Sequence, residues 1–211
     1  MSTELRLAHT SALDAATLAL ARALLADVFD GDFTAPDWEH ALGGLHVLLW
    51  EGRDLIGHAS VVQRRLLHGG RALRAGYVEG VGVRADRRRR GHGAAMMRAL
   101  EPVVRGAYDL GALGSTEAAA AFYRELGWRQ WLGPCSSLTP TGIVPTPADE
   151  RLDLRPPVHG GARRVRRAHL RLVRRRRLVG AVSRRAARWQ ATATGTGRRA
   201  CGTAATARRA R

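Results

Sequence analysis

Three strand-like segments, joined only by short turns, constrain the fold of this chain more than any other feature. They span residues 45–50, 55–67 and 71–83, and the turns between them read EGRD and HGG. Apolar runs of this length, separated by short polar turns that contain glycine, are typical of consecutive antiparallel strands. The sequence therefore predicts a three-stranded antiparallel meander.

Helix and strand patterns alternate on both sides of the meander. A strand is expected over residues 4–9, helices over 12–29, 92–107 and 116–126, a short buried strand over 109–113 and another strand from Trp128 onward. Pro36 after Thr34 indicates the start of a further short helix, and Gly127 is the expected C-cap of the helix before it. Pro102 is expected to bend or shorten its helix. This order predicts an α+β fold in which helices flank a mixed sheet.

The charge of the chain is divided unevenly along its length. All 35 basic residues are Arg, and 17 of them lie after residue 157, where there is no Asp or Glu. The formal net charge of +17 therefore belongs to residues 158–211, whereas residues 1–157 hold 18 Arg and 18 acidic residues. We expect residues 1–150 to form one folded domain. Residues 151–211 are expected to be a low-complexity, Arg-rich tail that is not a folded domain.

Three interpretations of the Arg-rich tail are open. One is an arm that binds the phosphates of nucleic acid without sequence preference. A second is an aberrant, frame-shifted C-terminus, because Arg, Ala and Gly have GC-rich codons and the whole chain lacks Lys and Asn. A solvated linker is the third.

Composition argues against several other classes of protein. The chain has no run of 18 apolar residues, so no transmembrane helix is expected, and its first residues do not resemble a secretory signal. Two cysteines, Cys135 and Cys201, are too few for a disulfide scaffold. His58, His68 and His92 lack metal-ligand spacing, so no metal is expected. We expect a cytoplasmic protein.

A basic, glycine-containing loop stands between the last meander strand and the next helix. Residues 88–93 read R-x-x-G-x-G. Glycines let backbone amides approach a ligand closely, and the start of a helix attracts anions, so the loop could hold a pyrophosphate. A basic turn without a ligand is the alternative. Shortly before the loop, Glu79 is a lone carboxylate in a Val/Gly-rich strand, and it is either a site residue or an edge residue that faces solvent.

The segment GYVEGVGVRADRRRRGHG, followed by a helix, resembles the acetyl-CoA motif of the GNAT acetyltransferase superfamily. GDFTAPDWEHALGG, QRRL, RGAYDLGAL and FYRELGW are similar to segments of one subfamily, the aminoglycoside 2'-N-acetyltransferases. The resemblance covers about residues 5–150. It implies the GNAT acyl-CoA N-acyltransferase fold, with acetyl-CoA as the donor and the 2'-amino group of an aminoglycoside as the acceptor.

The resemblance also implies a bulge near residues 79–82 that splays two parallel strands, and roles for individual residues. The backbone of Val81, Gly82 and Val83 would bind the pantetheine arm of acetyl-CoA, and the Val81 amide would stabilise the oxyanion. Glu79, acting through a water, would be the general base, and Tyr123 would protonate the departing thiolate; a core tyrosine is the alternative for Tyr123. The pyrophosphate would be held by the loop residues Arg88, Arg89, Arg90, Gly91, His92 and Gly93.

Carboxylates are expected around a polycationic substrate. The resemblance assigns substrate contacts to Asp32, Asp37, Glu79, Gly80 and Asp149. Asp32 and Asp37 also fit turn and helix-cap positions. A homodimer is implied as well.

The chain departs from the subfamily in three places. A Trp is expected where Arg87 stands, and Gly114 lies near a position where relatives often have Ser. After Asp149 relatives continue into a final strand and an acidic, Trp-containing segment that this chain lacks. The other interpretations are a nucleic-acid-binding protein, an acetyltransferase of another cationic amine, and the inactive product of a frame-shifted gene.

Overall fold

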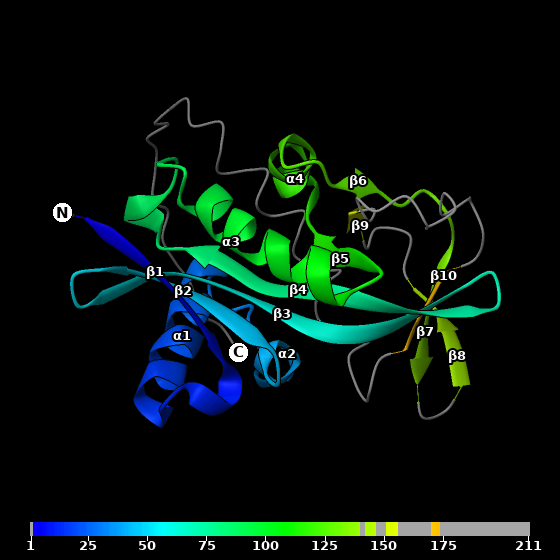
Figure 1. Cartoon of the computed structure of the whole chain (residues 1–211), viewed down its shortest axis with the longest axis horizontal. Helices are drawn as coiled ribbons and strands as arrows, with labels where there is room; N and C mark the ends of the chain where they lie inside the picture. The colour runs from blue at the N-terminus through cyan, green and yellow to red at the C-terminus, as the bar shows by residue number, and fades with distance from the viewer. Residues whose placement is uncertain (1, 140–141, 147–150, 156–169, 174–211) are drawn as a thin grey trace, which may run out of the picture.

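One mixed β-sheet runs through the molecule and carries helices on both faces (Figure 1). The computed structural model describes residues 2–139, 142–146, 151–155 and 170–173. Two helices, α1 and α2, lie on one face of the sheet, and α3 and α4 lie on the other. Their bounds are α1 Ala15–Val28, α2 Ala35–Ala41, α3 His92–Ala107 and α4 Ala120–Glu125. The predicted α+β architecture with a mixed sheet is confirmed.

The strands are joined into the sheet in an order that places the meander at its centre. They are β1 Thr3–His9, β2 Leu45–Glu51, β3 Asp54–His68, β4 Arg71–Val83, β5 Leu110–Ser115, β6 Arg129–Gln130, β7 Cys135–Thr139, β8 Gly142–Pro145, β9 Arg151–Arg155 and β10 Leu170–Val173. Strands β1 to β4 pair antiparallel in chain order, which confirms the meander. β5 pairs parallel to β4, and β9 pairs antiparallel to β5 and β6.

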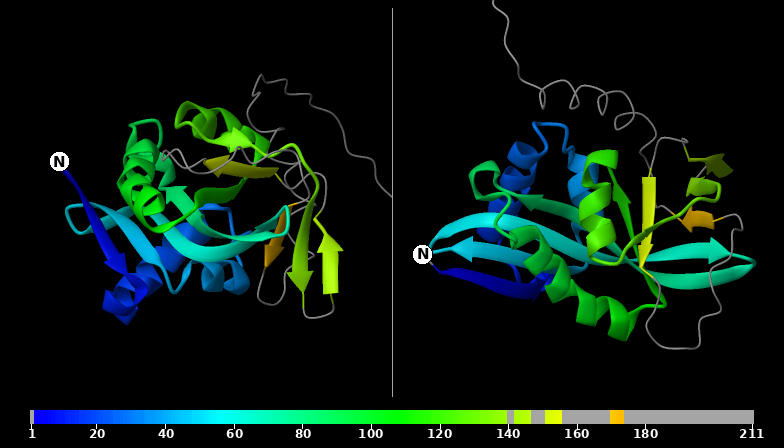
Figure 2. Two further views of the ribbon diagram at one scale, coloured as in Figure 1. Left: turned by 45° about the vertical axis from the view of Figure 1, so that its right-hand side comes forward. Right: turned by 90° about the horizontal axis from the view of Figure 1, so that it is seen from above.

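The two ends of the long β3–β4 hairpin have different surroundings. β10 pairs with β3 and β7 near the hairpin turn, and β8 pairs with β7 beyond it. The other end of β4 leads into α3, so the added strands lie away from the start of that helix (Figure 2). β9 and β10 both lie beyond residue 150, where the end of the folded domain was expected, and the sheet therefore continues past that point.

Short 3₁₀ turns break up the elements predicted from periodicity. They are η1 Thr10–Ala12, η2 Ala85–Arg87 and η3 Glu117–Ala119. The helix expected over residues 116–126 is η3 followed by α4, and Gly127 follows it with a φ of +83°. Pro102 does not shorten α3, which continues to Ala107; this proline is exposed and lies off the face that packs on the sheet.

Apolar side chains of the central strands point alternately to the two faces of the sheet, so each face has its own core. Val47 and Leu49 of β2 pack with Met96 of α3, whereas Leu48 between them packs with Leu25 of α1. Side chains of a strand point alternately to its two faces, so one apolar strand contributes to both clusters. In the part of the chain that the structure describes, no helix is long and apolar enough to cross a membrane.

Candidate functional site

Strands β4 and β5 part from each other halfway along β4. Their parallel pairing runs from Ala75 opposite Leu110 to Val78 opposite Leu113, while β4 itself continues to Val83. In the described pairings, the β4 edge from Glu79 onward therefore has no partner in β5. A gap between two parallel strands leaves backbone amides and carbonyls available to an extended ligand, because each of these groups needs a hydrogen-bond partner.

A β-bulge begins where the two strands part. Ser60 of β3 pairs with Glu79 and His58 pairs with Gly82, so β4 contains one residue more than β3 between these pairs. Gly80 lies in the bulge with a φ of +57°, and a Cβ there would lie 3.0 Å from Leu25 Cδ1. Both the backbone conformation and the space thus require glycine at this position.

The loop that follows β4 presents the start of α3. Gly91 is the N-cap of α3 with a φ of +80°, and Arg89 also has a positive φ, of +64°. The first amides of an α-helix have no partner within the helix, and the helix dipole adds positive charge there. Arg89, Arg90 and Gly91 are exposed, and His92 and Gly93 are half-buried, so the predicted loop residues surround one helix start.

Arg88 is placed differently from the two arginines that follow it. Its Nε donates to the carbonyl of Val83 at 3.1 Å, and its Nη2 donates to the carbonyl of Val28 at the end of α1 at 3.2 Å. The guanidinium therefore ties the loop to the end of β4 and satisfies a carbonyl at a helix C-terminus. These contacts occupy two of the five N–H groups of the arginine that was predicted to bind phosphate.

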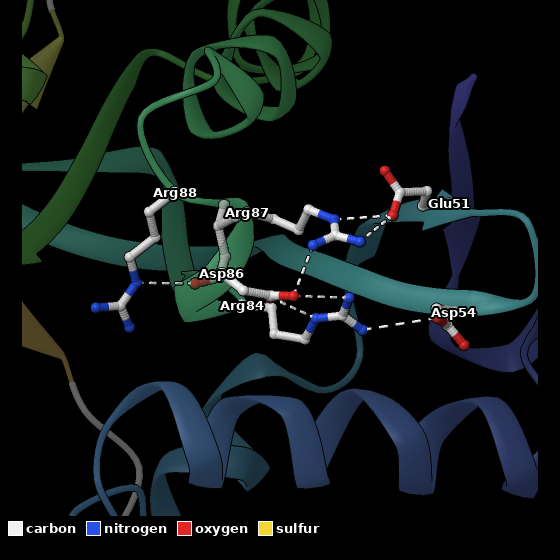
Figure 3. A network of polar contacts seen from close by, with 7 residues as sticks. Glu51, Asp54, Arg84, Asp86, Arg87 and Arg88 are labelled. Carbon is white, nitrogen blue, oxygen red and sulfur yellow. Dashed lines mark hydrogen bonds and ion pairs between the residues drawn. The ribbon is translucent and has the colours of Figure 1, made fainter. Parts of the chain in front are cut away.

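A network of acidic and basic side chains fixes the start of this loop to the β2–β3 hairpin (Figure 3). Arg87 contacts Glu51 at 2.7 Å and Asp86 at 2.6 Å, and Arg84 contacts Asp86 at 2.7 Å and Asp54 at 3.8 Å. The hydrogen bond from Arg87 lowers the pKa of Glu51, and the bond from Arg84 lowers that of Asp86. Arg87, which stands where a Trp was expected, thus serves to anchor η2.

Glu79 lies immediately before the bulge and is half-buried, with 23% of its side chain exposed. Its Oε1 is 3.8 Å from Nη2 of Arg64 on β3, and the same Nη2 donates to the carbonyl of His40 in α2 at 2.8 Å. Arg64 therefore links the candidate base to the end of α2. The carboxylate is not a solvent-facing edge group, which was the alternative interpretation of its sequence position.

Tyr123 of α4 is buried on the opposite face of the sheet from α1. It belongs to the buried cluster that includes Val78, against which Val81 and Val83 pack, and its ring lies edge-on to those of Phe122 and Trp128. Burial raises the pKa of Tyr123, and the nearby Asp153 raises it further. The phenol therefore keeps its proton at neutral pH.

Asp153 of β9 is a buried carboxylate that the sequence analysis did not identify. It is 1% exposed and accepts a hydrogen bond from the hydroxyl of Ser115 on β5. It lies in register with Leu113, at the point where β5 leaves β4. No signal in the sequence marked Asp153, because it lies beyond residue 150, where the resemblance to the family ends.

The expected substrate carboxylates divide between different environments. Asp32 is exposed in the turn after α1, whereas Asp37 forms the capping box of α2 and accepts from the amide of Thr34 at 2.9 Å and from its hydroxyl at 2.6 Å. Asp37 thus has the cap role that was its alternative interpretation. Asp149 lies outside the described residues. No cluster of three potential metal-ligating side chains occurs in the described part of the chain.

The splayed strands, the bulge and the glycine-capped helix start fit one protein family. Residues 9–131 match the family model of an acetyltransferase (GNAT) domain. The chain belongs to the GNAT acetyltransferase family. An aminoglycoside 2'-N-acetyltransferase of Mycolicibacterium fortuitum is 51% identical over 145 residues, which are 69% of this chain and 74% of that protein. The resemblance inferred from the sequence is thereby confirmed.

Solved structures agree with the GNAT fold at low sequence identity. ElaA of Escherichia coli has a TM-score of 0.53 and 18% identity, and the match covers 73% of this chain and 99% of that one. An acyl-CoA N-acyltransferase from Pseudomonas aeruginosa gives the same four values. At this identity the similarity shows the fold alone.

Proposed function

We propose that this GNAT acetyltransferase transfers the acetyl group of acetyl-CoA to the 2'-amino group of an aminoglycoside. The observation that carries the proposal is the position of Glu79, a half-buried carboxylate at the point where β4 and β5 part. The name of the relative from M. fortuitum supports the acceptor and the position of transfer.

The residues around the gap suit an extended ligand that ends in phosphates. The backbone of Val81, Gly82 and Val83 would hold the arm, and the exposed Arg89 and Arg90 beside the α3 start would contact the pyrophosphate. Gly91, His92 and Gly93 would contribute backbone amides, while Arg88 would hold the loop in place. Acetyl-CoA supplies the acetyl group activated as a thioester.

Three groups of the chain have the properties that acetyl transfer requires. The amine must lose a proton to attack, and Glu79 would accept it, directly or through a water. The Val81 amide, next to the bulge, would stabilise negative charge on the thioester oxygen. Tyr123 has a pKa that burial raises, so it would be protonated and able to donate to the leaving thiolate. Asp32, Asp37, Gly80 and Asp149 remain the proposed further contacts of the cationic acceptor.

The activity is tested by acetyl-CoA-dependent thiol release from the purified full-length protein. We expect release with an aminoglycoside that has a 2'-amine and none with one that has a 2'-hydroxyl. The assay contains enough salt to weaken non-specific binding of nucleic acid by the Arg-rich tail. A folded protein that binds acetyl-CoA and releases thiol with neither acceptor would contradict the proposed substrate. Sedimentation of the same sample tests the homodimer.

We expect Gly91→Val to raise the KM for acetyl-CoA. A Cβ at Gly91 meets no atom within 4 Å, so the substitution acts through the φ of +80°, which a β-branched residue does not tolerate. Loss of one amide contact to a charged phosphate costs about 1.5–3 kcal/mol, which is an increase in KM of about ten-fold or more.

Gly106→Val is the matched control for this loop variant. Gly106 also has open space around its Cβ, but it lies within α3 and has no positive φ. The KM of the Gly106→Val variant for acetyl-CoA should stay within about two-fold of the wild-type value. Equal KM values for the two variants would argue against phosphate binding by the loop.

A further inference from the structure

A continuous chain of hydrogen bonds crosses the interior from η1 to the bulge of β4. Thr10 Oγ1 lies 2.8 Å from His46 Nε2, and His46 Nδ1 lies 2.9 Å from His58 Nε2. His58 Nδ1 lies 2.8 Å from the carbonyl oxygen of Gly80. Both imidazoles are 0% exposed, and the ring of Trp38 lies 6.2 Å from the first and 5.9 Å from the second.

The carbonyl of Gly80 fixes the direction of the hydrogen bonds in this chain when both rings are neutral. The Gly80 oxygen can only accept, so His58 carries a proton on Nδ1. A neutral His58 then accepts at Nε2, and His46 must donate from Nδ1. A neutral His46 then accepts at Nε2, so the Thr10 hydroxyl directs its proton to this nitrogen at 2.8 Å rather than to the carbonyl of Gly44 at 3.2 Å, and it accepts from the amide of Gly43 at 2.9 Å. Burial lowers the pKa of both rings to about 4, so both are neutral at neutral pH, and the hydrogen bonds then place the proton of each ring on Nδ1.

The bond from His58 satisfies a carbonyl that the bulge removes from the ladder. In the described register, Glu79 and Gly82 pair with residues of β3 and Gly80 does not. Within that register, Gly80 therefore has no partner residue on the opposite strand. A buried carbonyl without a donor costs free energy, and His58 supplies the donor. A Cβ on Gly80 would be 3.3 Å from His58 Nδ1, which shows how closely the ring fits the bulge.

We propose that His58 is a positioning residue for acetyl transfer, because it holds the Gly80 carbonyl and so fixes the bulge at which β4 parts from β5. Glu79 precedes this carbonyl, and Val81 follows it. A shift of the bulge would therefore move the candidate base and the candidate oxyanion donor together. The inference rests on the proposed function, since acetyl-CoA is taken to occupy the gap between the strands.

Two substitutions of His58 separate its two hydrogen bonds. The side-chain amide of His58→Asn reaches about as far as Nδ1, so this variant can still donate to Gly80 but loses His46. The amide of His58→Gln extends to the position of Nε2, so it keeps a partner in His46 and loses Gly80. Leu66→Ala is the control for stability alone, because Leu66 is fully buried in β3 within a different cluster.

The variants are compared by thermal unfolding, by calorimetric titration with acetyl-CoA and by steady-state kinetics. We expect all three to be less stable than the wild type. Only His58→Gln should bind acetyl-CoA more weakly, by about ten-fold, and also show a lower kcat, since small displacements of reacting groups have large effects on rate. The proposal is overturned if His58→Gln binds like the wild type, or if affinity falls in all three variants alike.

Nitrogen NMR of histidine-labelled wild-type protein tests the same proposal without any substitution. At neutral pH we expect His46 and His58 to be neutral, with the proton on Nδ1 and a hydrogen-bonded signal for each. A protonated Nε2 on His58 would overturn the assigned direction of the bonds. Acetyl-CoA binding that follows the expected pattern, without acetylation of any 2'-amine, would leave the role of His58 in place and contradict only the proposed substrate.

Discussion

We expect Glu79→Gln to lower kcat by about 10²–10⁴-fold, the range by which a general base contributes to catalysis. Glutamine has the same size as glutamate but cannot accept the proton of the attacking amine. The affinity for acetyl-CoA, measured by calorimetry, should stay within about two-fold of the wild type, because the arm would be held by backbone groups. Loss of acetyl-CoA binding would instead assign Glu79 to the donor site.

Arg64→Gln is the matched control for this variant. It removes the 3.8 Å ion pair with Glu79 and keeps the carboxylate. The two atoms of this pair are 3.8 Å apart, too far for a hydrogen bond, and the carboxylate itself is kept, so kcat should change by less than about five-fold. The acidic limb of the pH–rate profile should persist in Arg64→Gln and disappear in Glu79→Gln. Equal losses of kcat would show that Glu79 acts through the ion pair.

The elements of this fold could be predicted because their signals are local. Strands β2 to β4 were expected within one or two residues of their observed bounds, since short turns and apolar runs determine them. α3 was expected over its observed residues, although Pro102 suggested an earlier end. Sequence patterns gave no indication of the short η3 or of the pairing of β9 with β5, because the first depends on the exact course of a turn and the second on a long-range contact.

The details of the site depend on contacts between residues that lie far apart in the sequence. Arg87 and Glu51 are 36 residues apart, so the sequence did not show that Arg87 anchors η2. The sequence also grouped Arg88 with Arg89 and Arg90 as phosphate contacts, whereas in the structure Arg88 donates to the carbonyl of Val83 in β4. Asp153 could not be assigned a role, because it lies after the last motif that the family resemblance covers. The bulge was expected near residues 79–82 from the family resemblance, and the structure has it there; the glycine pattern of β4 alone did not locate it.

The histidine pair depends on a register that only the structure shows. His46 pairs with Ser60, and Leu48 pairs with His58, so the two histidines are diagonal neighbours on the same face of adjacent strands. Diagonal neighbours in an antiparallel pair lie within reach of long side chains. The pairs next to the EGRD turn, Glu51 with Asp54 and Trp50 with Leu55, would by themselves place the two rings on opposite faces. The irregularity between Leu49 and Trp50 shifts the register by one residue and brings both rings to one face, and nothing in the sequence marks it.

We expect these two buried histidines to make the protein sensitive to mild acid. Burial lowers the pKa of both His46 and His58 from 6.5 to about 4. The charge of His9 adds to the lowering of the pKa of His46, whereas for His58 the hydrogen bond to Gly80 opposes it and the charge of His46 adds a smaller lowering. Between these values the unfolded chain binds protons that the folded protein does not, so stability is lost as the pH falls from 6.5 towards 4. At about pH 5 the loss amounts to about 2 kcal/mol for each ring.

Urea unfolding at constant ionic strength, from about pH 8 to about pH 5, measures this loss as a change in the free energy of unfolding. The window ends there because Glu51 and Asp86, whose pKa values are lowered, add their own loss of stability in stronger acid. His58→Gln removes one titrating ring, so its deficit relative to the wild type should shrink as the pH falls, whereas that of Leu66→Ala should stay constant. Parallel curves for the wild type and both variants would mean that the buried rings do not titrate in this window, and the acid sensitivity would then have another source.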